Sequence, residues 1–235
     1  MMPQMFKATL KQKTTLSPKA TGLTLQLIEP TKIEFNPGQF VNLKVADAVY
    51  RAYSIASPCA QQDKIFLIVT TSHEGVGSEY VRNLHIGDEV TFIGPSGKLH
   101  LKEKHSKAIY FFATGSGIAP FISMLEQLAC DNYSGKIHLF FGVRHPEEVL
   151  CLDELTGLKK RLKDFTIDFY VSNPQDDFMG VKGRVTAAIP NITDFNADFY
   201  LCGHPQMVED VNTALKAKGV PDENIICEGF TKTLK

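Results

Sequence analysis

The longest uncharged stretch of the chain runs from residue 108 to residue 125 and is interrupted in the middle. It is long enough for a membrane span, but Gly115, Gly117 and Pro120 break the regular helix that a bilayer requires. The apolar run before the glycines is typical of a buried strand, and the run after Pro120 is typical of a helix. The stretch therefore predicts a strand, a glycine-rich turn and a helix inside a globular protein.

The chain changes its pattern near residue 105. From residue 6 to residue 101, short β-rich runs alternate with turn residues, which indicates a small antiparallel barrel or sandwich. From residue 109 onward strands and helices alternate, which predicts a parallel sheet covered on both faces, with ligands at the carboxyl ends of its strands. We expect one domain over residues 1–104 and a second over residues 105–235.

The charges nearly balance, since 25 Lys and Arg oppose 26 Asp and Glu for a net charge of −1. This balance gives no general attraction to nucleic acid or to an anionic membrane surface. The five cysteines are widely scattered and have none of the close spacings of zinc or iron–sulfur sites, so no metal centre is predicted. Residues 1–13 contain no apolar signal-peptide core, so we expect a cytoplasmic protein without a membrane span.

The glycine-rich turn begins at Thr114 and continues through Gly115, Ser116 and Gly117. Glycines between a strand and a helix allow a backbone to approach a phosphate, and helix N-terminal amides favour anions. Pro120 stands where a Rossmann fingerprint has its third glycine, so the turn departs from that pattern. A simple tight turn is the alternative interpretation.

A second motif alternates two kinds of side chain along one predicted strand. Arg51 and Tyr53 share one face, and Ala52 and Ser54 share the other. A guanidinium and an aromatic ring on one face suit a phosphate next to a planar ring system. The alternative is a half-buried strand with an exposed arginine.

Taken together, the motifs resemble the ferredoxin–NADP reductase family from about residue 6 to residue 230. They are PGQF at 37–40, RAYS at 51–54, GVGS at 75–78, GPSG at 94–97, GSGIAP at 115–120, CGHPQM at 202–207 and EGF at 228–230. The resemblance implies an FAD-binding antiparallel Greek-key β-barrel followed by a Rossmann-like α/β domain that binds NAD(P).

The resemblance also assigns roles in the first domain. Arg51 is expected to pair with the FAD pyrophosphate, Tyr53 to lie against the isoalloxazine ring, and Ser54 to hydrogen-bond near flavin N5. Phe230 either covers the second flavin face or packs the domain interface. The other FAD-binding residues expected from the resemblance are Ala52, Val69, Thr70, Gly75, Val76, Gly77 and Ser78.

In the second domain, residues 114–117 are expected to cradle the dinucleotide pyrophosphate, and Cys202 and Gly203 to lie beside the nicotinamide ring. Ser54, Cys202 and Glu228 are the expected catalytic residues around the point where nicotinamide and flavin meet. Because a buried cysteine is more often a small apolar residue than a reactive thiol, we expect Cys202 to position the ring rather than attack it.

Coenzyme choice depends on the 2′-phosphate of NADPH. Arg144, Ser172 and Arg184 follow strands or open a helix at suitable places, whereas Asn173 occupies a position where NADPH-selective relatives often have arginine. These residues indicate a slight preference for NADPH over NADH. The alternative is that both arginines are solvated surface charges.

The expected function is hydride transfer from NAD(P)H to FAD, followed by electron transfer to a small redox protein such as a ferredoxin or flavodoxin. An alternative with the same chemistry is a reductase of free flavin or the reductase component of an oxygenase. An alternative of another class is a flavin-binding regulatory subunit without turnover.

Overall fold

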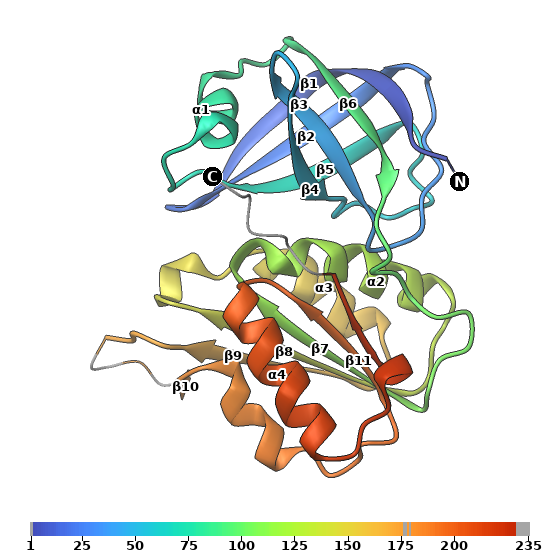
Figure 1. Ribbon diagram of the computed structural model, residues 1–235, viewed down its shortest axis with the longest axis vertical. Helices are drawn as coiled ribbons and strands as arrows, with labels where there is room; N and C mark the ends of the chain where they lie inside the picture. The colour runs from blue at the N-terminus through green and yellow to red at the C-terminus, as the bar shows by residue number, and fades with distance from the viewer. Residues whose placement is uncertain (1, 176–177, 179, 229–235) are drawn as a thin grey trace.

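The first half of the chain forms a six-stranded antiparallel barrel with strand order β4-β3-β6-β1-β2-β5 (Figure 1). The computed structural model describes residues 2–175, 178 and 180–228 of the 235. A bridge between Ile55 and Leu67 joins the two edges of the sheet and closes the barrel. The strands are β1 (Gln4–Ser17), β2 (Ala20–Glu29), β3 (Phe40–Ala46), β4 (Val49–Ser54), β5 (Lys64–Thr70) and β6 (Glu89–Ser96).

Alternation of apolar and polar residues explains the barrel. In β1, Phe6, Ala8 and Leu10 are fully buried while their neighbours face outward, as the two-residue period of a strand requires. The single helix α1 (Val76–Asn83) contributes Val81 to the same core. The sequence pattern predicts a short helix over residues 78–84, and α1 begins two residues earlier.

The second half is a parallel sheet with strand order β10-β9-β8-β7-β11-β12. The order reverses between β7 and β11, and such switch points open a crevice at the carboxyl ends of the strands. The elements are β7 (Ala108–Thr114), α2 (Ala119–Cys130), β8 (Lys136–Val143), α3 (Leu152–Arg161), β9 (Phe165–Val171), β10 (Val181–Lys182), β11 (Asp198–Cys202), α4 (Pro205–Ala217) and β12 (Ile225–Cys227).

Four short 3₁₀ turns complete the described part of the chain: η1 (Gly115–Ile118), η2 (Pro146–Glu148), η3 (Val185–Asn191) and η4 (Asp222–Asn224). The fold class predicted from the sequence is confirmed. The sequence pattern predicts a short helix over residues 185–189, and the structure instead forms the 3₁₀ turn η3, which contains Pro190. The short strand β10 was not expected. The division between domains at residues 104 and 105 stays a prediction.

The parallel sheet has a separate core on each face. Phe111 of β7 packs with α2 and α3 on one face, and its neighbours Tyr110 and Phe112 pack with η3 and α4 on the other. Strands buried on both faces are continuous apolar runs, which explains why residues 109–113 contain no polar side chain but the Tyr110 hydroxyl.

The first of these cores extends into the barrel. Ala20 of β2, Ile68 of β5 and Leu99 belong to the same buried cluster as Phe121 and Met124 of α2. Figure 1 shows α2 between the barrel and the parallel sheet. The two halves are therefore joined by an apolar interface that fixes their relative position.

The connection between the halves is also held by a buried carboxylate. Asp198 is 0% exposed, accepts a hydrogen bond from the Ser106 backbone N–H at 2.7 Å, and pairs with Lys102 Nζ at 2.6 Å. Lys102 Nζ also donates to Asn224 Oδ1 at 2.7 Å. These contacts fasten the segment between β6 and β7 to the start of β11.

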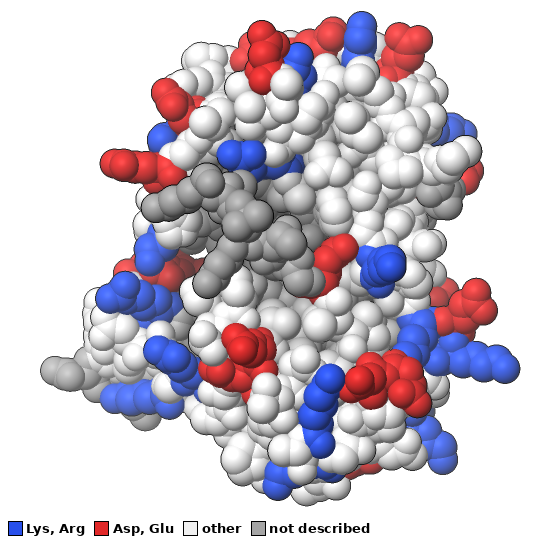
Figure 2. Space-filling view, viewed as in Figure 1, with Lys and Arg blue, Asp and Glu red and all other residues white. Residues whose placement is uncertain are grey.

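The surface carries both signs of charge. Figure 2 shows basic and acidic side chains interspersed on the visible face of both halves, in keeping with the net charge of −1. In the part of the chain that the structure describes, no helix is long and apolar enough to span a bilayer.

Candidate functional site

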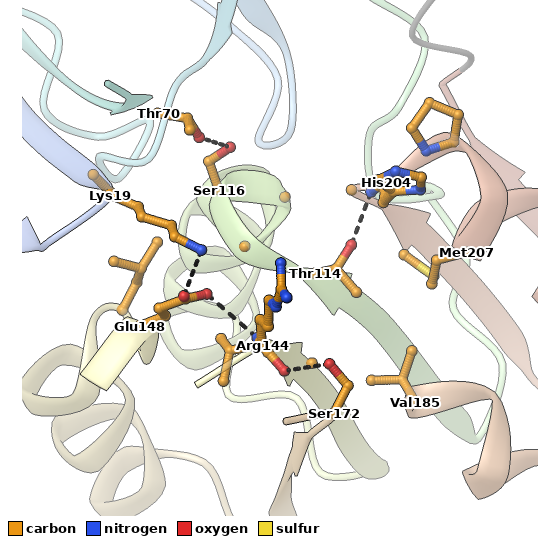
Figure 3. A pocket seen from close by; sticks show the side chains of 18 of the residues that line it. Lys19, Thr70, Thr114, Ser116, Arg144, Glu148, Ser172, Val185, His204 and Met207 are labelled. Atoms are coloured by element: carbon orange, nitrogen blue, oxygen red, sulfur yellow. Dashed lines mark hydrogen bonds and ion pairs between the residues drawn. The ribbon is translucent and has the colours of Figure 1, made fainter. Parts of the chain in front are cut away.

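A cavity of about 830 Å³ lies between the barrel and the carboxyl edge of the parallel sheet (Figure 3). Tyr53, Ser54 and Thr70 line it from the barrel. The ends of four parallel strands line it from the other side, through Thr114, Val143, Ser172 and Gly203 among others. The cavity therefore lies at the crevice that the strand order predicts.

The glycine-rich turn forms the floor of this cavity. Gly115 has a φ of 54°, and a Cβ there would meet no atom within 4 Å, so the space above it is open. A Cβ on Gly117 would overlap the carbonyl oxygen of Cys202, so this position requires glycine. The turn is the 3₁₀ segment η1, and α2 follows it directly from Ala119, one residue before the predicted start at Pro120.

Thr114 links the ends of the two central strands. Its Oγ1 accepts a hydrogen bond from the backbone N–H of His204 at 2.8 Å. Gly203 has a φ of 140°, and a Cβ there would overlap Thr114 Oγ1. His204 Nδ1 accepts a hydrogen bond from the Gln206 backbone N–H at 3.2 Å and caps α4. The His204 ring therefore has a structural partner at the start of α4.

On the barrel side, Arg51 and Tyr53 lie on one face of β4, as the sequence predicts. A Cβ added to Gly77 would be 2.7 Å from Tyr53 Oη and 3.1 Å from Arg51 Cγ. The N-terminal turn of α1 therefore lies directly against both side chains. At the N-cap, Gly75 has a φ of 151°, and a Cβ there would meet nothing within 4 Å. The arrangement leaves a cradle of open backbone beside a guanidinium, which fits a pyrophosphate such as that of FAD.

The remaining FAD-binding candidates lie on β4, on β5 and at the start of α1. Ser78 Oγ donates to the Thr70 carbonyl at 3.3 Å, and Val76 is 44% exposed. Ala52 lines the cavity from β4. Val69 is 0% exposed in the barrel core, and its expected part in FAD binding stays a prediction.

The three expected catalytic residues do not all line the cavity. Ser54 does, whereas Cys202 is 1% exposed and Glu228 is half-buried beside it. Glu228 Oε1 accepts a hydrogen bond from the Lys98 backbone N–H at 3.2 Å. Phe40 pairs with Ser54 across β3 and β4, and a Cβ on Gly97 would be about 3 Å from both Phe40 and Glu228.

Burial decides the ionisation of Cys202 and Glu228. It raises the pKa of the Cys202 thiol to about 12, and the nearby Glu228 carboxylate acts in the same direction. Burial also raises the pKa of Glu228, partly opposed by the hydrogen bond from Lys98. Cys202 is therefore a neutral thiol at physiological pH, as a positioning residue would be.

Arg144, Ser172 and Arg184 line one part of the cavity, so the structure brings these three candidates together. Ser172 Oγ donates to the Val143 carbonyl at 3.4 Å. Asn173 is exposed, donates its backbone N–H to the Arg144 carbonyl at 2.8 Å, and does not line the cavity. Phe230 lies outside the described residues.

The sequence interpretation missed an ion pair between the halves. Lys19 Nζ, from the turn between β1 and β2, lies 2.6 Å from Glu148 Oε1 in η2, and both residues line the cavity. No spacing rule connects them, because they meet only when the barrel packs on the sheet. No group of three or more His, Cys, Asp or Glu that could hold a metal occurs among the residues that the structure describes.

Comparison with known proteins identifies both halves. The family described as oxidoreductase FAD-binding domain matches residues 7–101, and the family described as oxidoreductase NAD-binding domain matches residues 111–213. The chain is 31% identical to the toluate 1,2-dioxygenase electron transfer component of Pseudomonas putida, over 96% of this chain and 67% of that protein. It is 33% identical to the 2-halobenzoate 1,2-dioxygenase electron transfer component of Burkholderia cepacia, over 98% and 70%.

The chain belongs to the ferredoxin–NADP reductase family. The reductase fold is also found in a cytochrome P450 reductase from Amycolatopsis, with a TM-score of 0.90 and 24% identity over 97% of this chain and 70% of that one. The reductase spans 59–67% of the length of its first five curated relatives. The chain therefore carries one FAD-binding domain and one NAD-binding domain.

Proposed function

We propose that the chain takes a hydride from NAD(P)H onto FAD and passes the electrons to a separate protein component of an oxygenase system. The observation that carries this proposal is that Tyr53 and Ser54 line the same cavity as Thr114–Gly117, from the opposite side. A flavin site and a dinucleotide site that open into one cavity can bring the two reacting rings together. FAD, when bound, supplies the hydride acceptor and then releases electrons one or two at a time.

The barrel residues would bind and orient the flavin. Arg51 would donate charge-assisted hydrogen bonds to the pyrophosphate, together with the backbone amides of Gly77 and Ser78 at the start of α1. The Tyr53 ring would pack against the isoalloxazine, and the Ser54 hydroxyl would donate a hydrogen bond near the hydride-accepting atom. The proposal is supported by the close approach of Gly77 to Arg51 and Tyr53.

The residues at the strand ends would hold the coenzyme. The open backbone of Gly115 would accommodate its pyrophosphate, and Cys202 and Gly203 would position the nicotinamide ring. Glu228 would orient that ring or the flavin from the edge of the site. Phe230 would cover the flavin or pack the interface between the halves.

For the coenzyme we propose a modest preference for NADPH. Arg144, Ser172 and Arg184 line one part of the cavity and can donate to a 2′-phosphate. Asn173 adds no third cation, and Glu148 places a carboxylate in the same part of the cavity. We therefore expect NADPH to be used better than NADH by roughly 10-fold in kcat/KM.

The acceptor is proposed from the relatives, since two of them are electron transfer components of dioxygenases. A ferredoxin or flavodoxin is the second candidate, supported by membership of the ferredoxin–NADP reductase family. Free flavin is the acceptor expected if no protein partner exists.

One anaerobic experiment tests these alternatives. The FAD-loaded protein is mixed with NADPH or NADH, flavin bleaching is followed, and a dioxygenase component, a ferredoxin, a flavodoxin or free flavin is then added. We expect bleaching, followed by reoxidation that is fastest with a protein acceptor. Failure of either coenzyme to bleach the flavin would contradict the proposal and favour a regulatory flavoprotein.

A further inference from the structure

Glu148 is an unusual residue in the part of the cavity around Arg144. Its side chain is only 13% exposed, whereas a carboxylate is normally well solvated. Its Oε2 accepts a hydrogen bond from the Arg144 backbone N–H at 3.3 Å, so the acid is held next to the proposed 2′-phosphate contacts. Figure 3 shows the Lys19 side chain extending to Glu148, with Arg144 beside it.

Lys19 comes from the other half of the molecule. It follows β1 and reaches Glu148 at 2.6 Å, with its own side chain 43% exposed. A carboxylate with so little exposure depends on this cation, because water supplies little compensation. With Lys19 in place, the pair is close to neutral in its effect on a nearby anion.

We infer that Glu148 sets the choice between NADPH and NADH, and that Lys19 of the barrel determines how strongly it does so. This inference rests on the proposed function, because it assumes that the 2′ group of the coenzyme lies near Arg144. A 2′-phosphate carries about two negative charges near neutral pH, and an unpaired Glu148 carboxylate would repel it. A 2′-hydroxyl is neutral and can donate a hydrogen bond to the same carboxylate.

The two partners therefore have opposite effects on selectivity. Without Lys19, the uncompensated charge of Glu148 lowers the affinity for NADPH and leaves the affinity for NADH little changed. Without the Glu148 charge, Lys19 becomes a free cation that favours NADPH, and NADH loses an acceptor. Removal of both returns the cavity to about its original charge. A role limited to holding the halves together would instead change binding of both coenzymes by the same factor.

The test is binding of 2′,5′-ADP and 5′-AMP to the FAD-loaded protein, measured by calorimetry, with kcat/KM for both coenzymes as a second readout. The variants are Lys19→Met, Lys19→Arg, Glu148→Gln and the double variant Lys19→Met with Glu148→Gln. Matched controls are Lys11→Met, an exposed lysine on β1, and Glu147→Gln, the exposed acid next to Glu148 and not part of the cavity.

We expect Lys19→Met to lower the ratio of 2′,5′-ADP to 5′-AMP affinity roughly 10-fold and Glu148→Gln to raise it by a similar factor. Lys19→Arg, the double variant and both controls should stay within about 3-fold of wild type. An unchanged ratio in Lys19→Met and Glu148→Gln, in a wild type that binds both nucleotides, would overturn this inference alone. A wild type that binds neither nucleotide would overturn the proposed dinucleotide site as well.

Discussion

Thr70 at the end of β5 donates a hydrogen bond from its Oγ1 to Ser116 Oγ in the glycine-rich turn, at 3.0 Å. The two residues belong to different halves, and both line the cavity. This bond fixes the floor of the dinucleotide site against the barrel strand that leads to α1. It places two proposed binding surfaces in a defined relationship before any ligand arrives.

Removal of this hydroxyl pair should slow hydride transfer without releasing the flavin. We expect Thr70→Val to reduce the single-turnover rate of flavin reduction about 3- to 10-fold, since a net hydrogen bond contributes about 0.5–1.5 kcal/mol. Ser116→Ala should have a similar effect, and the double variant should be no slower than either. The control is Thr21→Val, which removes a hydroxyl that pairs with that of Thr71 on the barrel. Stopped-flow bleaching gives the rates, and additive losses would show that the two hydroxyls act independently.

Arg51 should be the main charged contact of the flavin. Purified protein is expected to contain about one non-covalent FAD, and Arg51→Ala should weaken FAD binding by about 1.5–3 kcal/mol, the range for a charge-assisted hydrogen bond. Acid release followed by chromatography identifies the flavin, and equilibrium dialysis gives the affinity. Lys11→Ala serves as a surface control. Release of FMN instead of FAD would refute the assignment.

The contribution of Cys202 to stability should change with pH only under alkaline conditions. Burial raises its pKa from 9.0 to about 12, so the folded state retains the thiol proton longer than the unfolded chain does. Its stabilising contribution is complete below pH 9 and is lost as the pH rises toward 12, by about 1.4 kcal/mol per pH unit at most. The difference in unfolding free energy between wild type and Cys202→Ala should therefore shrink above pH 9. A difference that is constant from pH 7 to pH 11 would argue for an ordinary thiol pKa.

The same substitution should affect the reaction at neutral pH. A positioning role for Cys202 predicts that Cys202→Ala slows flavin reduction roughly 10- to 1,000-fold while FAD stays bound. Ser54→Ala is expected to behave in the same way. If both variants reduce their flavin at the wild-type rate, the two residues are scaffold only.

Coenzyme preference should respond to the cations that line the cavity. Arg184→Ala should lower the NADPH to NADH ratio of kcat/KM roughly 10-fold, mainly by raising the KM for NADPH. Asn173→Arg should raise the ratio by adding a cation beside Ser172. The control is Arg82→Ala, which removes a guanidinium that donates to the Thr71 carbonyl on the barrel. If the NADPH to NADH ratio of kcat/KM is unchanged in both variants, these positions face solvent and not the coenzyme.

Asp198 should be needed to hold the connecting segment. Asp198→Asn leaves Lys102 without its buried counter-charge, and we expect a loss of about 2–4 kcal/mol in the free energy of unfolding. Lys102→Met combined with Asp198→Asn should recover part of that loss. Denaturant unfolding of the FAD-loaded protein measures both, and Asp164→Asn is a solvent-exposed control.

Local patterns were sufficient to predict much of this molecule. The alternation in β1 and the apolar run of β7 each follow from a burial requirement that adjacent residues reveal. The same-face placement of Arg51 and Tyr53 follows from the two-residue period of a strand.

Relationships between the halves could not be predicted in this way. Lys19 and Glu148 lie on different elements, and their pairing depends on how the barrel packs against α2. A resemblance of motifs also does not say which side chains of β5 point into the core, as that of Val69 does. The glycine-rich turn was predicted, but its 3₁₀ conformation in η1 was not, because glycines permit several backbone conformations.

The apolar cluster that joins Ala20, Ile68 and Leu99 to Phe121 and Met124 has a consequence for how the molecule loses its structure. Either half on its own would present that surface to water, so the halves protect each other from aggregation and proteolysis. Heating should then produce one cooperative transition and not two. Nicotinamide coenzymes must also enter and leave along the mouth of the cavity, because a hinge that parted the halves would have to open this shared core.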